Sequence, residues 1–337
     1  MAKMDIAIDL GTAYTSIFVS GYGIVLHEPS VIAFFDNGGK RVTRAVGDDA
    51  YQMIGKAPDK TKIVYPITDG IIKDSEACSA MLSEFIKRIL PESYIVKPKL
   101  NAVVGVPTGI TVDERKMYEE VLMSAGVDSV SMVNSIMLAA IGAELPVESD
   151  YGGFIVSIGA GVTEIGVMSF CGIVNGCSIN IGGDMIDRTL VDSIRGLYNM
   201  KTDRKTAKKV KEKISSLIRN DRASMNVSGL DAETKNIVSR SVSADALYDA
   251  VAVYYYSIVD AIENFINSCS PSVAADIQKN GVTLVGGGAN IPGLKELMED
   301  RLELPVKIPQ GAHYATITGG GMLLNDPYFL DDILLHS

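Results

Sequence analysis

The sequence predicts an α/β fold in which two similar halves enclose a cleft. Its 337 residues suffice for about two domains, and a hydrophobic content of 47% can fill their cores. A strand, a glycine turn and a second strand occur near the N-terminus and again near the middle of the chain. Elsewhere, apolar strands alternate with amphipathic helices, which favours sheets with mostly parallel central strands.

The repeated hairpins indicate an internal duplication. Two β-rich runs within residues 4–19 flank a turn at Gly11, and two runs within residues 153–169 flank a turn at Gly159. The segments Asp9-Leu10-Gly11-Thr12 and Ser157-Ile158-Gly159-Ala160 are therefore predicted to be equivalent turns, one in each half. Because the strands of a hairpin are antiparallel, each sheet should be mixed.

Helices follow the first hairpin. Apolar residues recur at three- and four-residue intervals from Cys78 to Leu90, which is typical of a one-sided surface helix. A buried strand is predicted at Ala102 to Val106. After it, Thr111 and Glu114 form a capping box that begins a second helix, and Gly126 marks the end of this helix.

The second half of the chain contains a basic stretch, a polar stretch and a long helix after its hairpin. Lys201 to Lys213 is the most basic stretch, which fits a solvated helix face or a helix that closes over a nucleotide. Asn226 to Val242 fits a loop or the edge of a small subdomain. Ala244 to Cys269 is predicted to be a long helix whose tyrosines pack in the core. Pro292 suits the first turn of a later helix.

Charge and composition exclude several classes of function. The net charge of −10 argues against a nucleic-acid-binding protein. The four cysteines form no CxxC pair, so neither a disulfide framework nor a zinc site is expected. No apolar run reaches the roughly 18 residues of a spanning helix, and no signal peptide is recognisable at the start. We therefore expect a soluble, cytoplasmic protein.

Three glycine turns at strand ends predict an anion site in the cleft. Glycine lets consecutive backbone N–H groups approach one anion closely. The three turns are Gly11-Thr12, Gly159-Ala160-Gly161 and Gly286-Gly287-Gly288-Ala289. A fourth run, Gly319-Gly320-Gly321, fits either a ligand-binding turn or close helix packing.

Two acidic residues lie beside these turns. Asp9 is suited to hold Mg²⁺ through water, because hard cations prefer carboxylates and keep most of their hydration. The alternative is a carboxylate that accepts hydrogen bonds from the turn amides. Asp184 follows Gly182-Gly183, and we expect it at the edge of the cleft.

Eight stretches spread over nearly the whole chain carry a family resemblance. They are DLGTAYT (Asp9 to Thr15), GIVLHEPSV (Gly23 to Val31), YPITDGII (Tyr65 to Ile72), VGVPTG (Val104 to Gly109), AAIGAELPVE (Ala139 to Glu148), IGAGVTE (Ile158 to Glu164), INIGGDMID (Ile179 to Asp187) and LVGGGANIPGL (Leu284 to Leu294). In order and spacing they resemble the MreB and Mbl filament proteins, members of the bacterial actin family.

The resemblance implies an actin-like fold of duplicated α/β domains with mixed sheets around a cleft for ATP or ADP with Mg²⁺. Domain I would comprise residues 1–145 and 315–337, with a small subdomain at about 33–65. Domain II would comprise residues 146–314, with a small subdomain at about 182–243. The implied nucleotide contacts are Thr12, Ala13, Tyr14, Gly159, Ala160, Gly161, Lys208, Lys209, Val210, Lys211, Glu212 and, beneath the adenosine, Gly286, Gly287, Gly288 and Ala289.

Three departures from the family pattern bear on chemistry. Lys208 stands where relatives usually have a glutamate that contacts the ribose, and Glu212 lies one turn later. Ser157 replaces an aspartate that begins the second turn, and Asn134-Ser135 replaces paired glutamates. In relatives the latter two positions orient or activate the attacking water, and one positioned acid or base contributes about 10²- to 10⁴-fold. We therefore expect ATP binding with at most slow hydrolysis, and assign no catalytic residue.

The resemblance also implies partners. Identical subunits would form filaments through a head-to-tail contact that does not close into a ring. These filaments would organise cell shape together with membrane proteins of the wall-synthesis machinery. Tyr94 and Ile95, near Arg88 and Lys97, suit contact with a membrane surface, with ordinary loop packing as the alternative.

Two other functions share this type of cleft. A sugar or acetate kinase would need a substrate pocket with its own base, and no further acidic motif is evident. A non-polymerising ATP-binding scaffold or chaperone relative is the other alternative, although such chaperones append a peptide-binding domain. The filament protein is the leading hypothesis.

Overall fold

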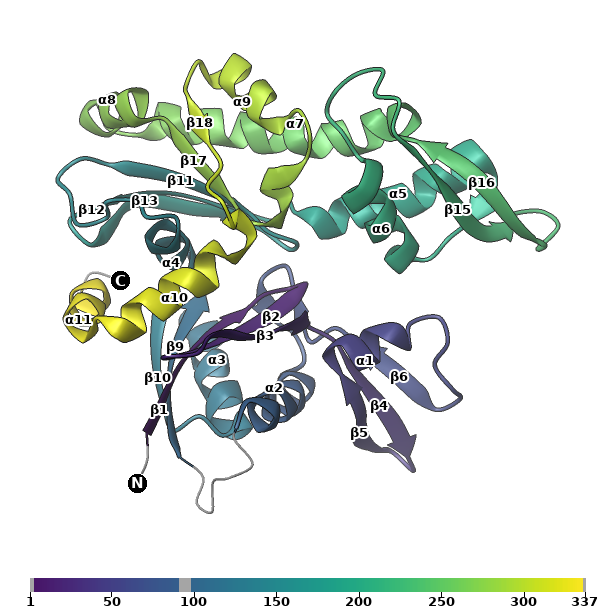
Figure 1. Ribbon diagram of the computed structural model, residues 1–337, viewed down its shortest axis with the longest axis horizontal. Helices are drawn as coiled ribbons and strands as arrows, with labels where there is room; N and C mark the ends of the chain where they lie inside the picture. Colours follow the sequence, from purple (N-terminus) through teal and green to yellow (C-terminus); the bar gives the residue numbers. More distant parts are fainter. Residues whose placement is uncertain (1–2, 91–97, 336–337) are drawn as a thin grey trace.

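The computed structural model describes residues 3–90 and 98–335, which form two lobes with a five-stranded mixed sheet in each (Figure 1). The strand orders are β10-β9-β1-β2-β3 and β13-β12-β11-β17-β18. In the first sheet β1 pairs antiparallel with β2 and parallel with β9. In the second, β11 pairs in the same way with β12 and β17. This correspondence confirms the predicted duplication.

The first sheet consists of β1 (Lys3–Leu10), β2 (Tyr14–Val19), β3 (Gly23–Pro29), β9 (Lys99–Val106) and β10 (Ser129–Asn134). One face packs against α2 (Ser75–Ile89) and α3 (Val112–Ala125) to form a hydrophobic core. The predicted capping box of α3 is present, and Gly126 ends this helix with a φ of 104°. Local sequence signals therefore suffice to define this helix.

A small sheet extends from the first lobe. It has the order β5-β4-β6, formed by β4 (Ile32–Asn37), β5 (Lys40–Val46) and β6 (Thr61–Val64), and α1 (Gly47–Gln52) packs on it. The short strands β7 (Ile67–Thr68) and β8 (Ile71–Ile72) form a separate hairpin.

The second sheet consists of β11 (Gly153–Ile158), β12 (Thr163–Ser169), β13 (Gly172–Ile179), β17 (Val282–Val285) and β18 (Val306–Lys307). Its core includes residues of α5 (Gly183–Tyr198), α7 (Ala244–Ser268), α8 (Pro271–Asn280) and α9 (Leu294–Leu302). Tyr255 of α7 is buried in this core, as predicted, and it also lines the cavity between the lobes.

A second small sheet extends from this lobe. It joins β14 (Met200–Lys201), β15 (Ser224–Asp231) and β16 (Ile237–Ser243), and α6 (Arg204–Ile214) lies beside it. The polar stretch 226–242 is therefore a pair of strands at a subdomain edge rather than a loop. In Figure 1, α6 lies on the side of its lobe that faces α1.

Two helices join the lobes. Figure 1 shows α4 (Ser135–Gly142) and α10 (Ala315–Asn325) between the sheets, with α11 (Pro327–Leu335) at the end of the described chain. Their core includes Ala7 from the first sheet and Ile155 from the second. A Cβ on Gly319 would overlap the carbonyl oxygen of Leu138 in α4. The run 319–321 therefore serves helix packing, and the ligand-turn alternative is wrong.

The segment before α9 differs from the prediction for Pro292. Pro292 does not lie in the first turn of a helix, because α9 begins at Leu294 after Gly293, whose φ is 88°. Before α9, the glycine turn forms a short 3-10 helix, η1 (Gly287–Asn290), and a second one, η2 (Ala312–Tyr314), precedes α10.

None of the helices in the described part of the chain combines the length and apolarity that a membrane crossing requires.

Candidate functional site

A cavity of about 560 Å³ lies between the two lobes and is lined by residues from both. The lining includes most of the predicted site residues: Asp9, Thr12, Ala13, Tyr14, Ser135, Ser157, Gly159, Ala160, Gly161, Lys208, Lys211, Glu212, Gly286, Gly287 and Gly288. Segments far apart in the sequence are thus brought together at one site.

The first two glycine turns have the same geometry. The Gly11 amide donates to the Tyr14 carbonyl at 3.1 Å, and the Gly159 amide donates to the Val162 carbonyl at 2.9 Å. Each turn follows the first strand of its hairpin, as the duplication predicts. Residues of both turns line the cavity.

These two turns also meet. A Cβ on Gly161 would overlap Oγ1 of Thr12 and would lie 2.9 Å from the Gly70 nitrogen. The Thr12 hydroxyl oxygen accepts a hydrogen bond from the Gly70 amide at 2.9 Å. Glycine at position 161 is consequently required for the backbones of the two lobes to approach this closely.

Each hairpin contributes one carboxylate to the cavity, but from opposite strands. In the first hairpin Asp9 pairs with Ser16, and in the second Ser157 pairs with Glu164. Paired residues of an antiparallel ladder share a face of the sheet. The acid missing at Ser157 is therefore matched by Glu164 on the neighbouring strand.

Glu164 is the principal site residue that sequence reasoning missed. Oε2 accepts a hydrogen bond from the Ser135 hydroxyl at 2.6 Å, and Oε1 accepts one from the Thr108 amide at 2.8 Å. Burial raises the pKa of Glu164, and these two donors oppose the shift. Its strand register opposite Ser157 was the signal that could have identified it.

Asp9 lies at the end of β1 and lines the cavity. Burial raises its pKa to about 7, and the nearby Glu164 carboxylate adds to the shift. The charged form of Asp9 is thus costly in the absence of a cation, because two carboxylates share a poorly solvated site. A bound divalent cation would offset this cost.

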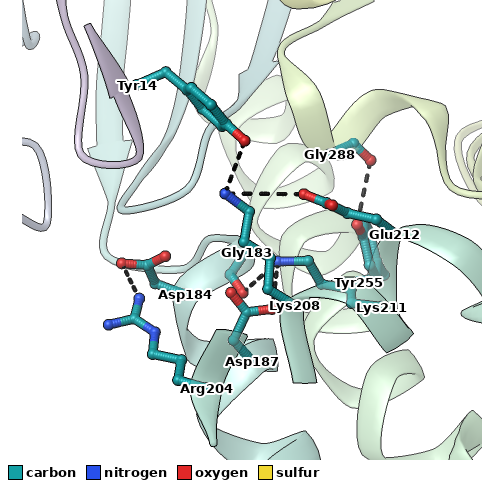
Figure 2. A network of polar contacts seen from close by, with 10 residues as sticks. All are labelled: Tyr14, Gly183, Asp184, Asp187, Arg204, Lys208, Lys211, Glu212, Tyr255 and Gly288. Carbon is teal, nitrogen blue, oxygen red and sulfur yellow. Dashed lines mark hydrogen bonds and ion pairs between the residues drawn. The ribbon is translucent and has the colours of Figure 1, made fainter. Parts of the chain in front are cut away.

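The basic helix α6 faces the cavity with one side only. Lys208 Nζ donates to the Tyr14 hydroxyl at 3.2 Å and lies 3.9 Å from Glu212 (Figure 2). Lys211 Nζ lies 2.7 Å from the buried Asp187 carboxylate and donates to the Gly183 carbonyl at 2.8 Å. The cationic groups on this side therefore already have protein partners.

Three of the predicted contacts do not line the cavity. Lys209 is exposed on the far side of α6, whereas Val210 and Ala289 are fully buried in the hydrophobic core. Helical geometry explains the first two, because successive residues on a helix point in directions about a quarter-turn apart. Within the implied contact turn, Lys208, Lys211 and Glu212 line the cavity.

Asp184 lies at the start of α5, beside the cavity rather than in its lining. Its carboxylate forms an ion pair with Arg204, as Figure 2 shows. Its backbone amide donates to the Ala160 carbonyl at 2.8 Å. Asp184 therefore connects the second glycine turn to α6.

The third glycine turn follows β17. Gly286 has a φ of 86°, and a Cβ there would collide with the backbone of Ile158. The Gly288 carbonyl accepts a hydrogen bond from the Tyr255 hydroxyl at 3.2 Å (Figure 2). This turn is thereby packed against the end of β11.

An aromatic cluster lines the cavity on the first-lobe side. The ring of His27 stacks on Tyr14 at 4.6 Å and meets the edge of Tyr314 at 4.9 Å. His27 Nδ1 is also 2.9 Å from the Ser16 hydroxyl. Burial lowers the pKa of His27, and His313 and Lys208 lower it further against the opposing effect of Asp48. Sequence reasoning missed this cluster because its members are far apart in the chain.

The predicted membrane contact, Tyr94 and Ile95, lies outside the described residues.

Sequence comparisons identify the relatives of this chain. A family model described as MreB/Mbl protein matches residues 3–331. Cell shape-determining protein MreB of Escherichia coli strain K12 is 34% identical over 96% of this chain and 94% of the relative. Cell shape-determining protein Mbl of Bacillus subtilis strain 168 is 35% identical, with 97% of each chain covered.

Solved structures agree with the sequence comparisons. MreB5 of Spiroplasma citri bound to ADP superposes with a TM-score of 0.89 at 30% identity, covering 98% of each chain. The same protein bound to AMPPNP gives 0.87 at 29% identity, with 96% of each chain covered. A MamK double helical filament, 20% identical with a TM-score of 0.80, shares the fold. This chain therefore belongs to the MreB/Mbl family and has its actin-like fold.

Proposed function

We propose that this chain binds ATP in the cavity between its lobes and assembles into cytoskeletal filaments. The observation that carries the proposal is the meeting of two glycine turns, one from each half, where Gly161 abuts Thr12. Such turns bind phosphate through backbone N–H groups without requiring a positively charged protein. The solved complexes of MreB5 with ADP and AMPPNP support this assignment.

Magnesium is part of the proposal. Asp9 fits a hydrated Mg²⁺, because its carboxylate lies in the cavity with a pKa raised to about 7 by burial and by Glu164. When bound, the ion would neutralise charge on the phosphates. Asp9 would hold its water shell, and Glu164 would keep its two donors, Ser135 and Thr108.

We further propose that hydrolysis is slow. Ser135 and Ser157 line the cavity where family members usually carry acids, and a serine hydroxyl is a poor base at neutral pH. The Ser135 hydroxyl is moreover engaged in donating to Glu164. Binding of the phosphates through backbone N–H groups does not need these acids. ATP can therefore bind in the cavity even where its hydrolysis is slow.

Filament formation rests on family membership. The E. coli and B. subtilis relatives are cell shape-determining proteins, and this chain matches them over nearly its full length. The proposed assembly is head-to-tail and open-ended. Its proposed place is the cytoplasm, with membrane proteins of wall synthesis as partners.

Two measurements test this function. Electron microscopy with and without ATP and Mg²⁺ should reveal filaments, and their absence under all conditions would exclude a polymer. Titration calorimetry should detect nucleotide binding that Gly161→Ala abolishes, because the added methyl group would overlap Thr12. Gly196→Ala is the matched control, since a Cβ there meets no atom within 4 Å. Equal affinity in both variants would contradict the proposed phosphate site.

A further inference from the structure

Three cations on one face of α6 contact three tyrosines of the other lobe. Arg204, Lys205 and Lys208 have the helical spacing that places their side chains on one side. The tyrosines are Tyr65, Tyr51 and Tyr14, which come from three different segments of the first lobe. Their contacts therefore join α6 of the second lobe to the first lobe.

Each cation lies within about 6 Å of the centre of a tyrosine ring. Lys208 Nζ is 4.3 Å from the centre of the Tyr14 ring, and Lys205 Nζ is 4.7 Å from that of Tyr51. The guanidinium carbon of Arg204 is 5.7 Å from the centre of the Tyr65 ring. These distances lie within the range of attractive cation–π interactions.

Hydrogen bonds fix the middle pair most firmly. Lys205 Nζ donates to the Tyr51 carbonyl and to the Gln52 side-chain oxygen, both at 3.2 Å. Tyr51 and Gln52 lie at the end of α1, so Lys205 joins α6 to the first small subdomain. Neither Lys205 nor Tyr51 lines the cavity.

The other two contacts link this face of α6 to the cavity. Lys208 and Tyr14 both line it, and Tyr14 belongs to the first glycine turn. Arg204 also pairs with Asp184, whose amide bonds to Ala160 in the second glycine turn. Opening the gap between α1 and α6 would therefore separate Lys208, on the second lobe with Arg204 and Asp184, from Tyr14 of the first glycine turn.

We propose that Arg204, Lys205 and Lys208 with Tyr65, Tyr51 and Tyr14 form a clasp that holds the lobes closed and slows nucleotide exchange. The clasp uses contacts within the chain alone, so it closes the lobes before any nucleotide binds. The effect of the clasp on nucleotide exchange rests on the proposed ATP binding. Its effect on the closure of the lobes is independent of that proposal.

Small-angle X-ray scattering of the nucleotide-free protein, below the concentration of assembly, tests closure. The variant K205M/K208M keeps the aliphatic stems but lacks two of the clasp cations, and its radius of gyration should exceed that of the wild type. Lys213→Met removes an exposed charge from the same helix and should leave the radius unchanged. An equal radius in K205M/K208M and wild type would overturn the clasp.

Release of a fluorescent ATP analogue in the presence of Mg²⁺ tests the control of exchange. Loss of this partly exposed cation–π contact should accelerate release about two- to fivefold in Tyr51→Leu, and at least as much in Lys205→Met, which also loses two hydrogen bonds. Tyr51→Phe retains the ring face and should release the analogue at the wild-type rate, as should Lys213→Met. The double variant K205M/Y51L should release the analogue about as fast as Lys205→Met, because removal of the Lys205 ammonium already abolishes its contact with the Tyr51 ring together with its two hydrogen bonds.

The two readouts separate the proposals. If Lys205→Met and Tyr51→Leu release the analogue at the wild-type rate, the clasp does not slow nucleotide exchange and that part of the proposal is wrong. Absence of analogue binding by the wild type would overturn the proposed ATP site and the exchange effect with it. Scattering would still decide whether the clasp closes the lobes.

Discussion

At the scale of residues, the acids of the cleft are distributed differently from the sequence-based expectation. Position 157 in the second hairpin carries serine, whereas the equivalent position in the first hairpin carries Asp9. The residue paired with Ser157 across the ladder is, however, the acid Glu164. Two carboxylates thus remain, but Glu164 is already held by Ser135 and Thr108. This arrangement favours binding a cation over activating a water molecule.

If hydrolysis is slow as proposed, replacing Ser135 and Ser157 with the acids that are usual in the family should accelerate it. The double variant Ser135→Glu, Ser157→Asp is expected to release phosphate about 10²-fold faster than the wild type, since one positioned acid or base contributes at least that much. Steady-state phosphate release at saturating ATP measures the effect. Nucleotide affinity, measured in parallel, should change little, and an unchanged rate at full occupancy would contradict the assigned role of these serines.

The half-buried His27 should make the protein sensitive to acid. Its lowered pKa means that the folded protein binds a proton at this ring less readily than the unfolded chain, whose histidine has a pKa of 6.5. The free energy of unfolding should therefore decrease as pH falls below about 6.5. Urea denaturation at several pH values, with His27→Gln for comparison, measures this dependence.

The variant should show a flatter response between pH 7 and the lowered pKa, because it lacks the titrating ring. The neighbouring charges, Lys208, His313 and Asp48, remain in both proteins. Parallel pH profiles for the wild type and His27→Gln would rule out His27 as the source of this sensitivity.

At the scale of elements, α4 and α10 determine how the two lobes are joined. A Cβ on Gly142 would overlap the carbonyl of Ala315, and one on Gly319 would overlap that of Leu138. The two helices thus pack backbone against backbone. Overpacking such a contact costs about 1–3 kcal/mol or more, so Gly319→Ala should destabilise the protein by at least about 2 kcal/mol.

Chemical denaturation measures this loss. Gly196→Ala in α5 serves as the control, because its Cβ would meet no neighbour and alanine favours a helix by about 0.5–1 kcal/mol over glycine. Equal stability of the two alanine variants would show that α10 can move away from α4 at no cost.

Elements with strong local signals could be predicted from the sequence. The capping box at Thr111 and Glu114 and the long helix from Ala244 depend on neighbouring residues and were correct. The strands β15 and β16 were less certain, because their exposed faces are polar. The position of Pro292 was wrong because the glycine turn continues into η1 before α9 begins.

Contacts between distant segments could not be predicted in the same way. The glycine turns at Gly11 and Gly159 were identified from the sequence, because the signals for strands and turns are local. The pairing of Lys208 with Tyr14, 194 residues apart, depends on the closure of the two lobes. Glu164 depends on strand register, and a shift of one residue would point its side chain away from the cleft. The domain limits and the nucleotide contacts stay predictions.

At the scale of the whole molecule, the duplicated fold places backbone donors and carboxylates from both halves around one cavity. With a net charge of −10, the chain does not attract anions as a whole, so the proposed ATP binding would depend on local backbone geometry. We propose that this geometry retains ATP, while the serines at positions 135 and 157 leave its hydrolysis slow.

A single-turnover experiment tests that claim most directly. Labelled ATP with Mg²⁺ is mixed with an excess of protein, and the bound nucleotide is recovered and identified over time. The account predicts that the label is protein-bound and remains ATP long after the Ser135→Glu, Ser157→Asp variant has converted its own to ADP. Failure of the label to bind, or conversion to ADP as fast in the wild type as in that variant, would contradict it.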